Sequence, residues 1–207
     1  MTTAITLLDG GMGQELIRRS SAAKPHPLWS LQVMMDEPEL VANVHRDFCL
    51  AGARVICLNT YSVTRHRLQM GNELPDLPEL LKHAGDLARA GIQASGLHGI
   101  DVVASLPPLT ASYLKQSPLS PTQMKDEYKE LMELQRHHVD GFLAETLSSV
   151  AEGEAVLRAA QEAGTGVHLA FTVQDEDGTL LRSGELLEDA LRACVPLKPL
   201  SVILNCS

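Results

Sequence analysis

The chain has 207 residues, 44% hydrophobic and 21% charged, and 17 basic against 26 acidic residues give a formal net charge of −9. This composition excludes a disordered chain, and the length allows a sizeable buried core. The acidic balance argues against nucleic acid or an anionic membrane as partner. Apolar runs fall short of a membrane span, no signal peptide is evident, and the four cysteines form no disulfide framework. We therefore expect a single cytoplasmic domain over residues 1–207.

Short apolar runs rich in Val, Ile and Leu alternate with amphipathic stretches along the chain. The runs are Ala4–Leu8, Arg54–Leu58, Asp101–Leu106, Gly141–Ala144, Gly166–Val173 and Ser201–Leu204. Several are nearly continuous, which is typical of parallel strands that are buried on both faces. The pattern predicts six strands.

Helix start and stop signals separate these runs. Capping-box pairs are Asp36 with Glu39, Asp76 with Glu79, Ser120 with Gln123 and Ser149 with Glu152. Pro121 suits the first position of its helix, and Gly52 and Gly164 suit the left-handed residue after a helix end. The third of these helices carries one apolar stripe, made of Met124, Tyr128, Leu131 and Met132. A last helix ends before Pro196.

Five strand–helix units followed by a sixth strand predict an α/β fold. Repeated right-handed βαβ units give either an open doubly wound sheet or a closed (β/α)8 barrel. A full barrel usually needs about 250 residues. A barrel of this chain would therefore lack its last quarter.

Polar residues follow most of the predicted strands, at the ends where both α/β architectures collect their chemistry. The groups are Asp9-Gly10-Gly11-Met12-Gly13, Asn59-Thr60-Tyr61, Glu145-Thr146, Thr172 and Asn205-Cys206. Two carboxylates, several hydroxyls and amides and one thiol are therefore expected at one rim.

Each carboxylate has a structural and a functional interpretation. Asp9 can cap its own turn. Glu145 is costly to desolvate unless a cation or a hydrogen-bond donor meets it. Because no Lys or Arg lies at a predicted strand end, the two acids favour a ligand that brings its own cation, such as an amino group. A structural use of Glu145 stays the alternative.

Two other chemistries fit poorly. The glycines after Asp9 lack the third glycine of a dinucleotide fingerprint, and Asn59 stands where an acid would bind the ribose. A Schiff-base aldolase requires a lysine on a strand. No lysine of this chain lies within a predicted strand. Cys49, Cys57 and Cys194 are expected as small buried hydrophobes and His168 as a packed or hydrogen-bonded strand residue. Cys206 alone is no zinc site, since zinc needs three or four ligands.

Several separated motifs nevertheless agree in their order along the chain. They are Leu8-Asp9-Gly10-Gly11-Met12-Gly13, Pro27-Leu28-Trp29-Ser30, the helix from Pro38 to Gly52, Leu58-Asn59-Thr60-Tyr61, the stretch from Asp140 to Thr146, and Asn205-Cys206. Together they resemble the homocysteine S-methyltransferase family, and the resemblance covers essentially the whole chain.

The resemblance implies a (β/α)8 barrel that moves a methyl group from a small donor onto the sulfur of homocysteine, giving methionine. In the family, Zn²⁺ held by three cysteines binds that sulfur as a thiolate, because coordination deprotonates a thiol. Residues carried over by position would bind homocysteine: Asp9, Gly10, Gly11, Asn59, Thr60, Glu145 and Thr146. Of these, Asp9 and Glu145 would hold the amino-acid end. Cys206 would be the first zinc ligand, and no catalytic residue is assigned.

The chain departs from the family pattern in two respects. The remaining two zinc ligands come from an adjacent cysteine pair in a Gly-Gly-Cys-Cys motif, which this sequence lacks. We therefore expect a C-terminally incomplete barrel, either a fragment or a shortened relative. Betaine users surround their quaternary ammonium with aromatics, whereas aromatics make up 3% here and Ser62 follows Tyr61. S-Methylmethionine or another sulfonium donor therefore fits better.

Three hypotheses follow. The leading one is a zinc-dependent homocysteine S-methyltransferase or its N-terminal part. The second is a catalytically inactive shortened barrel that binds an amino acid or a partner, closed by formation of a homo-oligomer, since open sheet edges are normally covered. The third is a lyase that uses Asp9 and Glu145 as acid and base.

Overall fold

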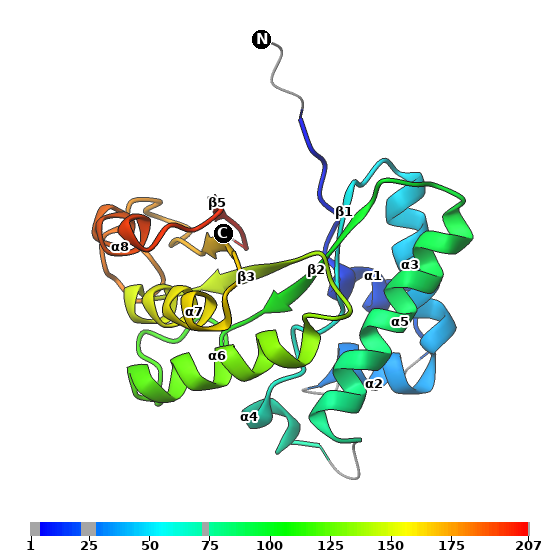
Figure 1. The fold of residues 1–207 in the computed structure, drawn as a ribbon, viewed down its shortest axis with the longest axis horizontal. Helices are drawn as coiled ribbons and strands as arrows, with labels where there is room; N and C mark the ends of the chain where they lie inside the picture. Colours follow the sequence, from blue (N-terminus) through cyan, green and yellow to red (C-terminus); the bar gives the residue numbers. More distant parts are fainter. Residues whose placement is uncertain (1–4, 22–27, 72–74, 207) are drawn as a thin grey trace. The chain divides into compact units, whose positions relative to one another are not determined.

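The computed structural model describes residues 5–21, 28–71 and 75–206 (Figure 1). Helices alternate with parallel strands in this part of the chain, which confirms the predicted α/β class. The described residues form two compact units. The first runs to Ala104 and includes His137–Asp140, and the second comprises Ser105–Arg136 and the chain from Gly141 onward.

The first unit combines a short parallel ladder with a layer of helices. Its elements are α1 (Met12–Arg19), α2 (Trp29–Asp36), α3 (Pro38–Leu50), β1 (Val55–Cys57), α4 (Arg65–Leu68), α5 (Leu77–Ser95) and the start of β2 (Asp101–Leu106). β1 pairs in parallel with β2, so that Val55 lies opposite Asp101. Asp140 closes this ladder, because its carboxylate accepts a hydrogen bond from the Val102 amide at 2.8 Å.

Helices α3 and α5 lie side by side (Figure 1). Gly91 makes their close approach feasible, since a Cβ there would lie 2.4 Å from the Ala42 carbonyl oxygen and 2.8 Å from the His45 Cβ. His45 is fully buried, and neither ring nitrogen has a hydrogen-bond partner among the described residues. Burial lowers the pKa of His45 to about 3, because the charged imidazolium is disfavoured away from water.

The first predicted strand is wrong as an extended element within the described residues. Only Leu8 forms a parallel bridge, with Val55, and α1 begins soon after it at Met12. Exposure explains the difference, since Leu7 and Leu8 are 53% and 41% exposed. An apolar segment whose side chains are not buried against a neighbouring layer gains little stability from pairing as a β-strand. Residue 4 lies outside the described residues.

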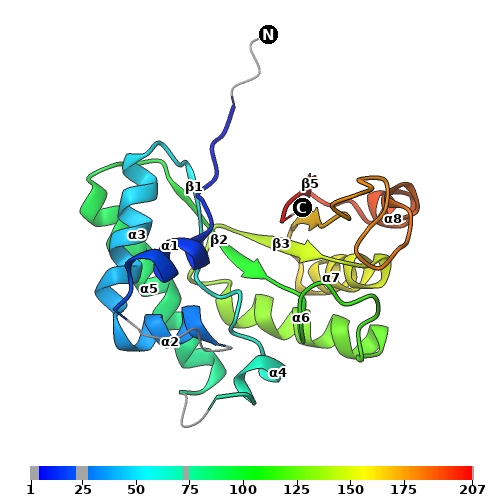
Figure 2. The same cartoon turned by 180° about the vertical axis from the view of Figure 1, so that it is seen from behind.

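The second unit stacks two helices beside parallel strands (Figure 1, Figure 2). Its elements after β2 are α6 (Pro121–Gln135), β3 (Gly141–Leu147), α7 (Val150–Ala163), β4 (His168–Phe171), α8 (Leu187–Cys194), the 3-10 helix η1 (Val195–Leu197) and β5 (Ser201–Leu204). β4 pairs in parallel with both β3 and β5. The predicted strands 101–106 and 201–204 match β2 and β5, and β3 extends past its predicted end at Ala144.

Most predicted helix signals are confirmed. Ser120 and Ser149 each form a complete capping box, and the Asp76 carboxylate accepts from the Glu79 amide. The apolar stripe of α6 is buried, and Gly52 and Gly164 adopt positive φ after their helices. The Asp36 cap is wrong: Asp36 ends α2, and α3 begins at Pro38 with no side-chain cap. Pro38 stops α2 because the residue before a proline avoids helical geometry.

The remaining cysteine and histidine predictions also hold in part. Cys49 and Cys194 are buried on their helices, whereas Cys57 is half-buried in β1. Burial raises the pKa of Cys194 to about 12. The His168 Nδ1 lies 2.8 Å from the Ser201 hydroxyl, as expected for a hydrogen-bonded strand histidine. No helix in the described ranges combines the length and hydropathy that a bilayer crossing requires.

Candidate functional site

Polar side chains of the second unit meet where its strands end, and we call this group the strand-end cluster: Ser105, Glu145, Thr146, Asn205 and Cys206. The Ser105 hydroxyl donates to Glu145 Oε1 at 2.6 Å, and Asn205 Nδ2 donates to Glu145 Oε2 at 3.4 Å. The Thr146 hydroxyl donates to the Cys206 sulfur at 3.3 Å. These contacts place the predicted acid and the predicted thiol in one hydrogen-bonded group.

Irregular backbone geometry at the end of β3 sets the orientation of Glu145 and Thr146. The ladder between β3 and β4 shifts register between Ala144 and Leu147, and Thr146 within that shift has φ +60. The Asn205 amide holds the bend, since its Oδ1 accepts from the Thr146 amide at 2.9 Å. Bulges of this kind re-aim side chains near functional sites. The irregular end of β3 therefore presents Glu145 and Thr146 to the segment after β5.

The end of β4 fixes that segment in turn. Thr172 donates its hydroxyl to the Cys206 carbonyl at 3.0 Å, and the Asn205 amide donates to the Phe171 carbonyl at 3.1 Å. The structure thus brings Glu145, Thr146, Thr172 and the Asn205-Cys206 pair together at the carboxyl ends of the strands, as the sequence predicts.

Sequence reasoning missed two residues at this place, Tyr113 and Arg182. The Arg182 guanidinium carbon lies 5.2 Å from the centre of the Tyr113 ring, and its two terminal nitrogens pair with Asp175 at 2.6 and 3.1 Å. An antiparallel bridge between Val173 and Leu181 folds Arg182 back to the end of β4, where its amide donates to the Thr172 carbonyl. The Asp-Gly turn at 177–178 was the available signal for this return.

In the first unit, Asp9 is tied to β1. Its Oδ2 accepts from the Cys57 amide at 2.8 Å, and its own amide donates to the Val55 carbonyl at 3.0 Å. The carboxylate thus bonds across to a neighbouring strand rather than only within its own turn. Gly10 lies against Phe48, since a Cβ on Gly10 would lie 2.8 Å from the aromatic ring, whereas Gly11 has room for one.

Asn59 and Thr60 are buried just after β1. The Asn59 side-chain amide donates to the Ser30 carbonyl at 3.0 Å, and the Thr60 amide donates to the Leu58 carbonyl at 2.7 Å. Buried amides and hydroxyls with such partners are held in fixed orientations. Asp9, Gly10, Gly11, Asn59 and Thr60 thus belong to the first unit, and Glu145, Thr146 and Cys206 to the second.

The described residues do not by themselves fit a zinc ion. Zinc takes three or four protein ligands. Cys206 is exposed and brings one thiol, and nowhere in the described ranges do three Cys, His, Asp or Glu side chains gather as a metal site would need.

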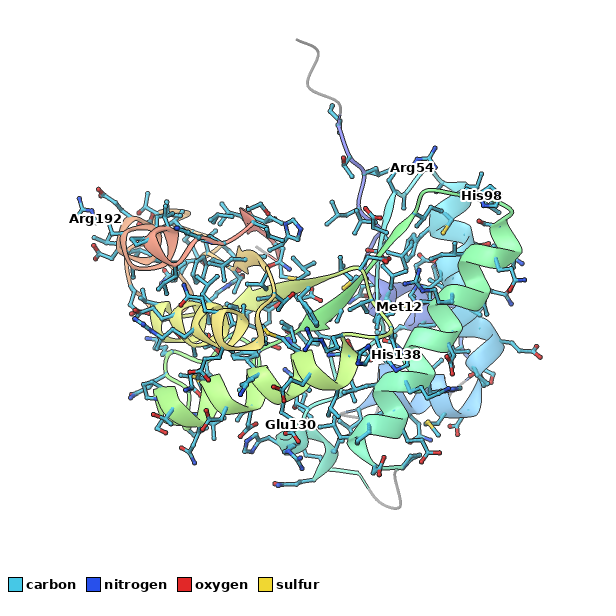
Figure 3. The ribbon with its side chains drawn as sticks, in the orientation of Figure 1. Met12, Arg54, His98, Glu130, His138 and Arg192 are labelled. Atoms are coloured by element: carbon cyan, nitrogen blue, oxygen red, sulfur yellow. The ribbon has the colours of Figure 1, made fainter. Side chains whose placement is uncertain are left out.

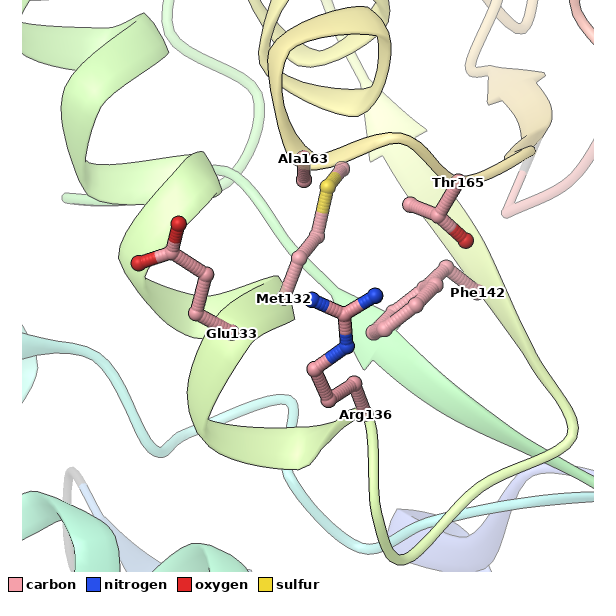
Figure 4. Close-up of a pocket in the computed structure, with 6 residues that line it drawn as sticks. All are labelled: Met132, Glu133, Arg136, Phe142, Ala163 and Thr165. Atoms are coloured by element: carbon pink, nitrogen blue, oxygen red, sulfur yellow. The ribbon is translucent and has the colours of Figure 1, made fainter.

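The second unit also contains a small cavity that is separate from the strand-end cluster. It lies between the end of α6 and the end of α7 and has a volume of about 10 Å³ (Figure 4). Its lining is Met132, Glu133, Arg136, Phe142, Ala163 and Thr165. That volume admits about one water molecule, and none of the predicted site residues lines it.

The family model described as homocysteine S-methyltransferase matches residues 6–207. The chain belongs to this family. Homocysteine S-methyltransferase 2 of Zea mays is 26% identical over 97% of this chain, which spans 65% of that relative's length. The YbgG homocysteine S-methyltransferase of Bacillus subtilis is 38% identical over 30% of this chain and 20% of its own.

The crystal structure of the metallated form of the homocysteine methyltransferase MmuM from Escherichia coli has the same fold. It superposes with a TM-score of 0.83 over 99% of this chain and 75% of its own, at 23% identity. This likeness confirms the predicted (β/α)8-type barrel fold for the part of the barrel that this chain carries.

Proposed function

We propose that this chain binds homocysteine and takes part in transferring a methyl group from a small sulfonium donor, such as S-methylmethionine, to the homocysteine sulfur. The observation that carries the proposal is the strand-end cluster, in which Glu145, Thr146 and Cys206 are joined through hydrogen bonds in a chain of the homocysteine S-methyltransferase family. The product is methionine.

The proposed reaction is a direct substitution at the methyl carbon. Homocysteine gives up its thiol proton to solvent, and an electron pair of its sulfur forms the new bond to the methyl group. The bond between that methyl and the sulfonium sulfur breaks, and its electron pair returns to the donor, which leaves as a neutral thioether. A free thiol with a pKa near 8.5 is mostly protonated at neutral pH, so the reaction needs a means of holding the thiolate.

Glu145 is proposed to meet the ammonium group of homocysteine. The carboxylate is half-buried and accepts hydrogen bonds from the Ser105 hydroxyl and the Asn205 side-chain amide, which orient it. A partly desolvated carboxylate gains most from a cation that a ligand delivers. Thr146 would line the same place, and Asp9, Gly10, Gly11, Asn59 and Thr60 are proposed as further homocysteine-binding residues on their own unit.

Zn²⁺ is proposed as the cofactor, with Cys206 as one ligand. Because the described residues bring a single thiol to this place, no step of the proposed reaction is assigned to the metal. Zinc content of the purified chain under reducing conditions, compared with that of Cys206→Ser, tests this ligand. Equal zinc in both would refute it.

Homocysteine binding is the test of the site itself. Glu145→Gln keeps the shape of the side chain and removes the charge, so calorimetry should show about 10- to 100-fold weaker homocysteine binding, the effect of one charge-assisted hydrogen bond. Glu133→Gln, an exposed residue of α6 paired with Lys129 at 3.7 Å, is the matched control and should bind as the parent does. Unchanged affinity in Glu145→Gln would contradict the proposal.

A second candidate is an amino-acid-binding module without methyl transfer, which is favoured because the described residues bring only one thiol, Cys206, to the strand-end cluster. Incubation with methyl-labelled S-methylmethionine and homocysteine separates the two. Labelled methionine supports the enzyme. Homocysteine binding with no labelled product supports the module.

A further inference from the structure

A groove of the second unit lies between the turn at residues 177–179 and α8. Its volume is about 330 Å³, within the range of about 300–1,000 Å³ that is usual for ligand pockets. We call this surface the α8 groove, and its lining residues are Gly178, Thr179, Leu186, Leu187, Glu188 and Leu191. These residues differ from those of the strand-end cluster, so the proposed homocysteine site leaves the groove without a role.

The floor of the α8 groove is apolar and only partly covered. Leu187 and Leu191 are half-buried, and Leu186 is 46% exposed. Val195 continues the same face of the helix, because it follows Leu191 by four residues, and it is 53% exposed. A neighbouring stripe of α8 supplies the buried side: Ala190 and Cys194. Apolar side chains that stay exposed together along one groove indicate an interaction surface, whereas single exposed leucines do not.

The chain around the α8 groove is strongly acidic. Residues 175–192 contain six acidic and two basic side chains, a net charge of −4 out of −9 for the whole chain. Arg182 pairs with Asp175 at 2.6 Å. Arg192 pairs with Glu188 at 2.6 Å (Figure 3). Because both basic side chains are paired within the segment, a molecule that approaches the apolar floor meets a negative potential.

We propose that the α8 groove binds an amphipathic helix of a partner protein, with apolar side chains on one face and Lys or Arg beside them. Charge complementarity sets the sign of the partner, since basic side chains meet the acidic rim while apolar side chains fill the groove. The four-residue spacing of Leu187, Leu191 and Val195 suits a helix as partner, because rows of side chains four apart pack into the grooves of a second helix.

The same charges disfavour two other occupants. A second copy of this chain, bound symmetrically, would set the acidic segments 175–192 of the two copies against each other. An anionic membrane surface would repel this segment as well. A basic amphipathic helix matches both the apolar floor and the charge of the rim.

Two synthetic peptides test the sign of the partner. Each has about 18 residues, long enough to form a helix, and carries leucines on one face. Lysines fill the other face of the first peptide, and glutamates fill that of the second. Fluorescence anisotropy measures the binding of each labelled peptide to the intact 207-residue chain. The Leu/Lys peptide should bind about tenfold more tightly than the Leu/Glu peptide, and added salt should reduce this ratio.

Variants of the chain test the place of binding. Leu186→Ser removes a lining side chain at the N-cap of α8, where serine is favoured, so the helix is kept while Leu/Lys affinity should fall about fivefold. Leu50→Ser changes a leucine of α3 that is 59% exposed and is the matched control. Glu188→Gln should weaken binding about twofold. Glu154→Gln, which removes a carboxylate paired with Arg158 at 3.0 Å on α7, should bind as the parent does.

Equal affinity of the chain for the two peptides would overturn the proposed basic partner. Unchanged affinity in Leu186→Ser, or an equal loss in Leu50→Ser, would show that the peptide binds elsewhere and would overturn the groove. Sedimentation velocity of the chain alone tests the remaining occupant. Self-association that Leu186→Ser abolishes would assign the groove to a second copy and refute the partner helix.

Discussion

The substitution Gly91→Ala should destabilise the first unit although alanine favours helices. A Cβ at Gly91 would lie 2.4 Å from the Ala42 carbonyl oxygen and 3.0 Å from the Arg46 amide nitrogen. Both are backbone atoms, so α3 and α5 must move apart. Overpacking of this kind costs up to about 3 kcal/mol, and the gain in helix propensity of about 1 kcal/mol leaves a net loss of about 2 kcal/mol.

Thermal and urea unfolding of the whole chain measure this loss. For a chain of this size the midpoint should fall by about 4–8 °C. Gly85→Ala on the same helix is the matched control, because its new Cβ would meet the His138 side chain at 3.0 Å (Figure 3) rather than backbone. The His138 Cβ at 3.0 Å needs to move by only a few tenths of an ångström, whereas the Ala42 oxygen lies at 2.4 Å from the Cβ at Gly91, so the loss should be smaller. A Gly91→Ala protein as stable as its parent would refute the reasoning that backbone contact sets the spacing of these helices.

Three further predictions follow from single side chains. Ser149→Ala removes half of a capping box and should cost about 1 kcal/mol in urea unfolding, with the exposed Thr122→Ala near neutral as its control. His45 is neutral in the folded chain, and its pKa of about 3 lies below the unfolded value of 6.5. Its contribution to stability is therefore complete above pH 6.5 and is lost as pH falls toward 3, by up to about 1.4 kcal/mol per pH unit; a slope in His45→Leu as steep as in the parent would disprove this role. Cys194, buried with a pKa raised to about 12, should resist iodoacetamide at pH 8 while exposed Cys206 is labelled, and early Cys194 labelling in mass spectra would count against that.

Helix-capping pairs predicted helix starts correctly where no neighbouring residue imposed a different start. Ser149 with Glu152 has the spacing of a reciprocal cap, and the helix begins there. Asp36 has the same spacing to Glu39, yet Pro38 forces a helix start two residues later. The first strand failed because alternation and hydropathy do not report whether a partner covers the run, and Leu7 and Leu8 stay exposed.

Only those residues of the candidate site that lie at the ends of strands were predictable from the sequence. Glu145 and Thr146 lie at the end of β3, and Asn205 and Cys206 directly follow β5, so topology alone places them at one edge. Arg182 and Tyr113 reach the same place from segments that the strand pattern does not describe, through a turn at Asp177-Gly178 and a residue with φ +63. A bend of this sort depends on tertiary contacts, which a single sequence does not display.

The amide of Asn205 has a consequence for how this chain can change over generations. It serves the Thr146 amide, the Thr146 hydroxyl and the Glu145 carboxylate at once. Aspartate there would set a second negative charge against Glu145, and alanine would leave the Thr146 amide without its acceptor. Variation at Asn205 should therefore be inherited together with compensating changes at 145 and 146, so that these three positions evolve as one unit.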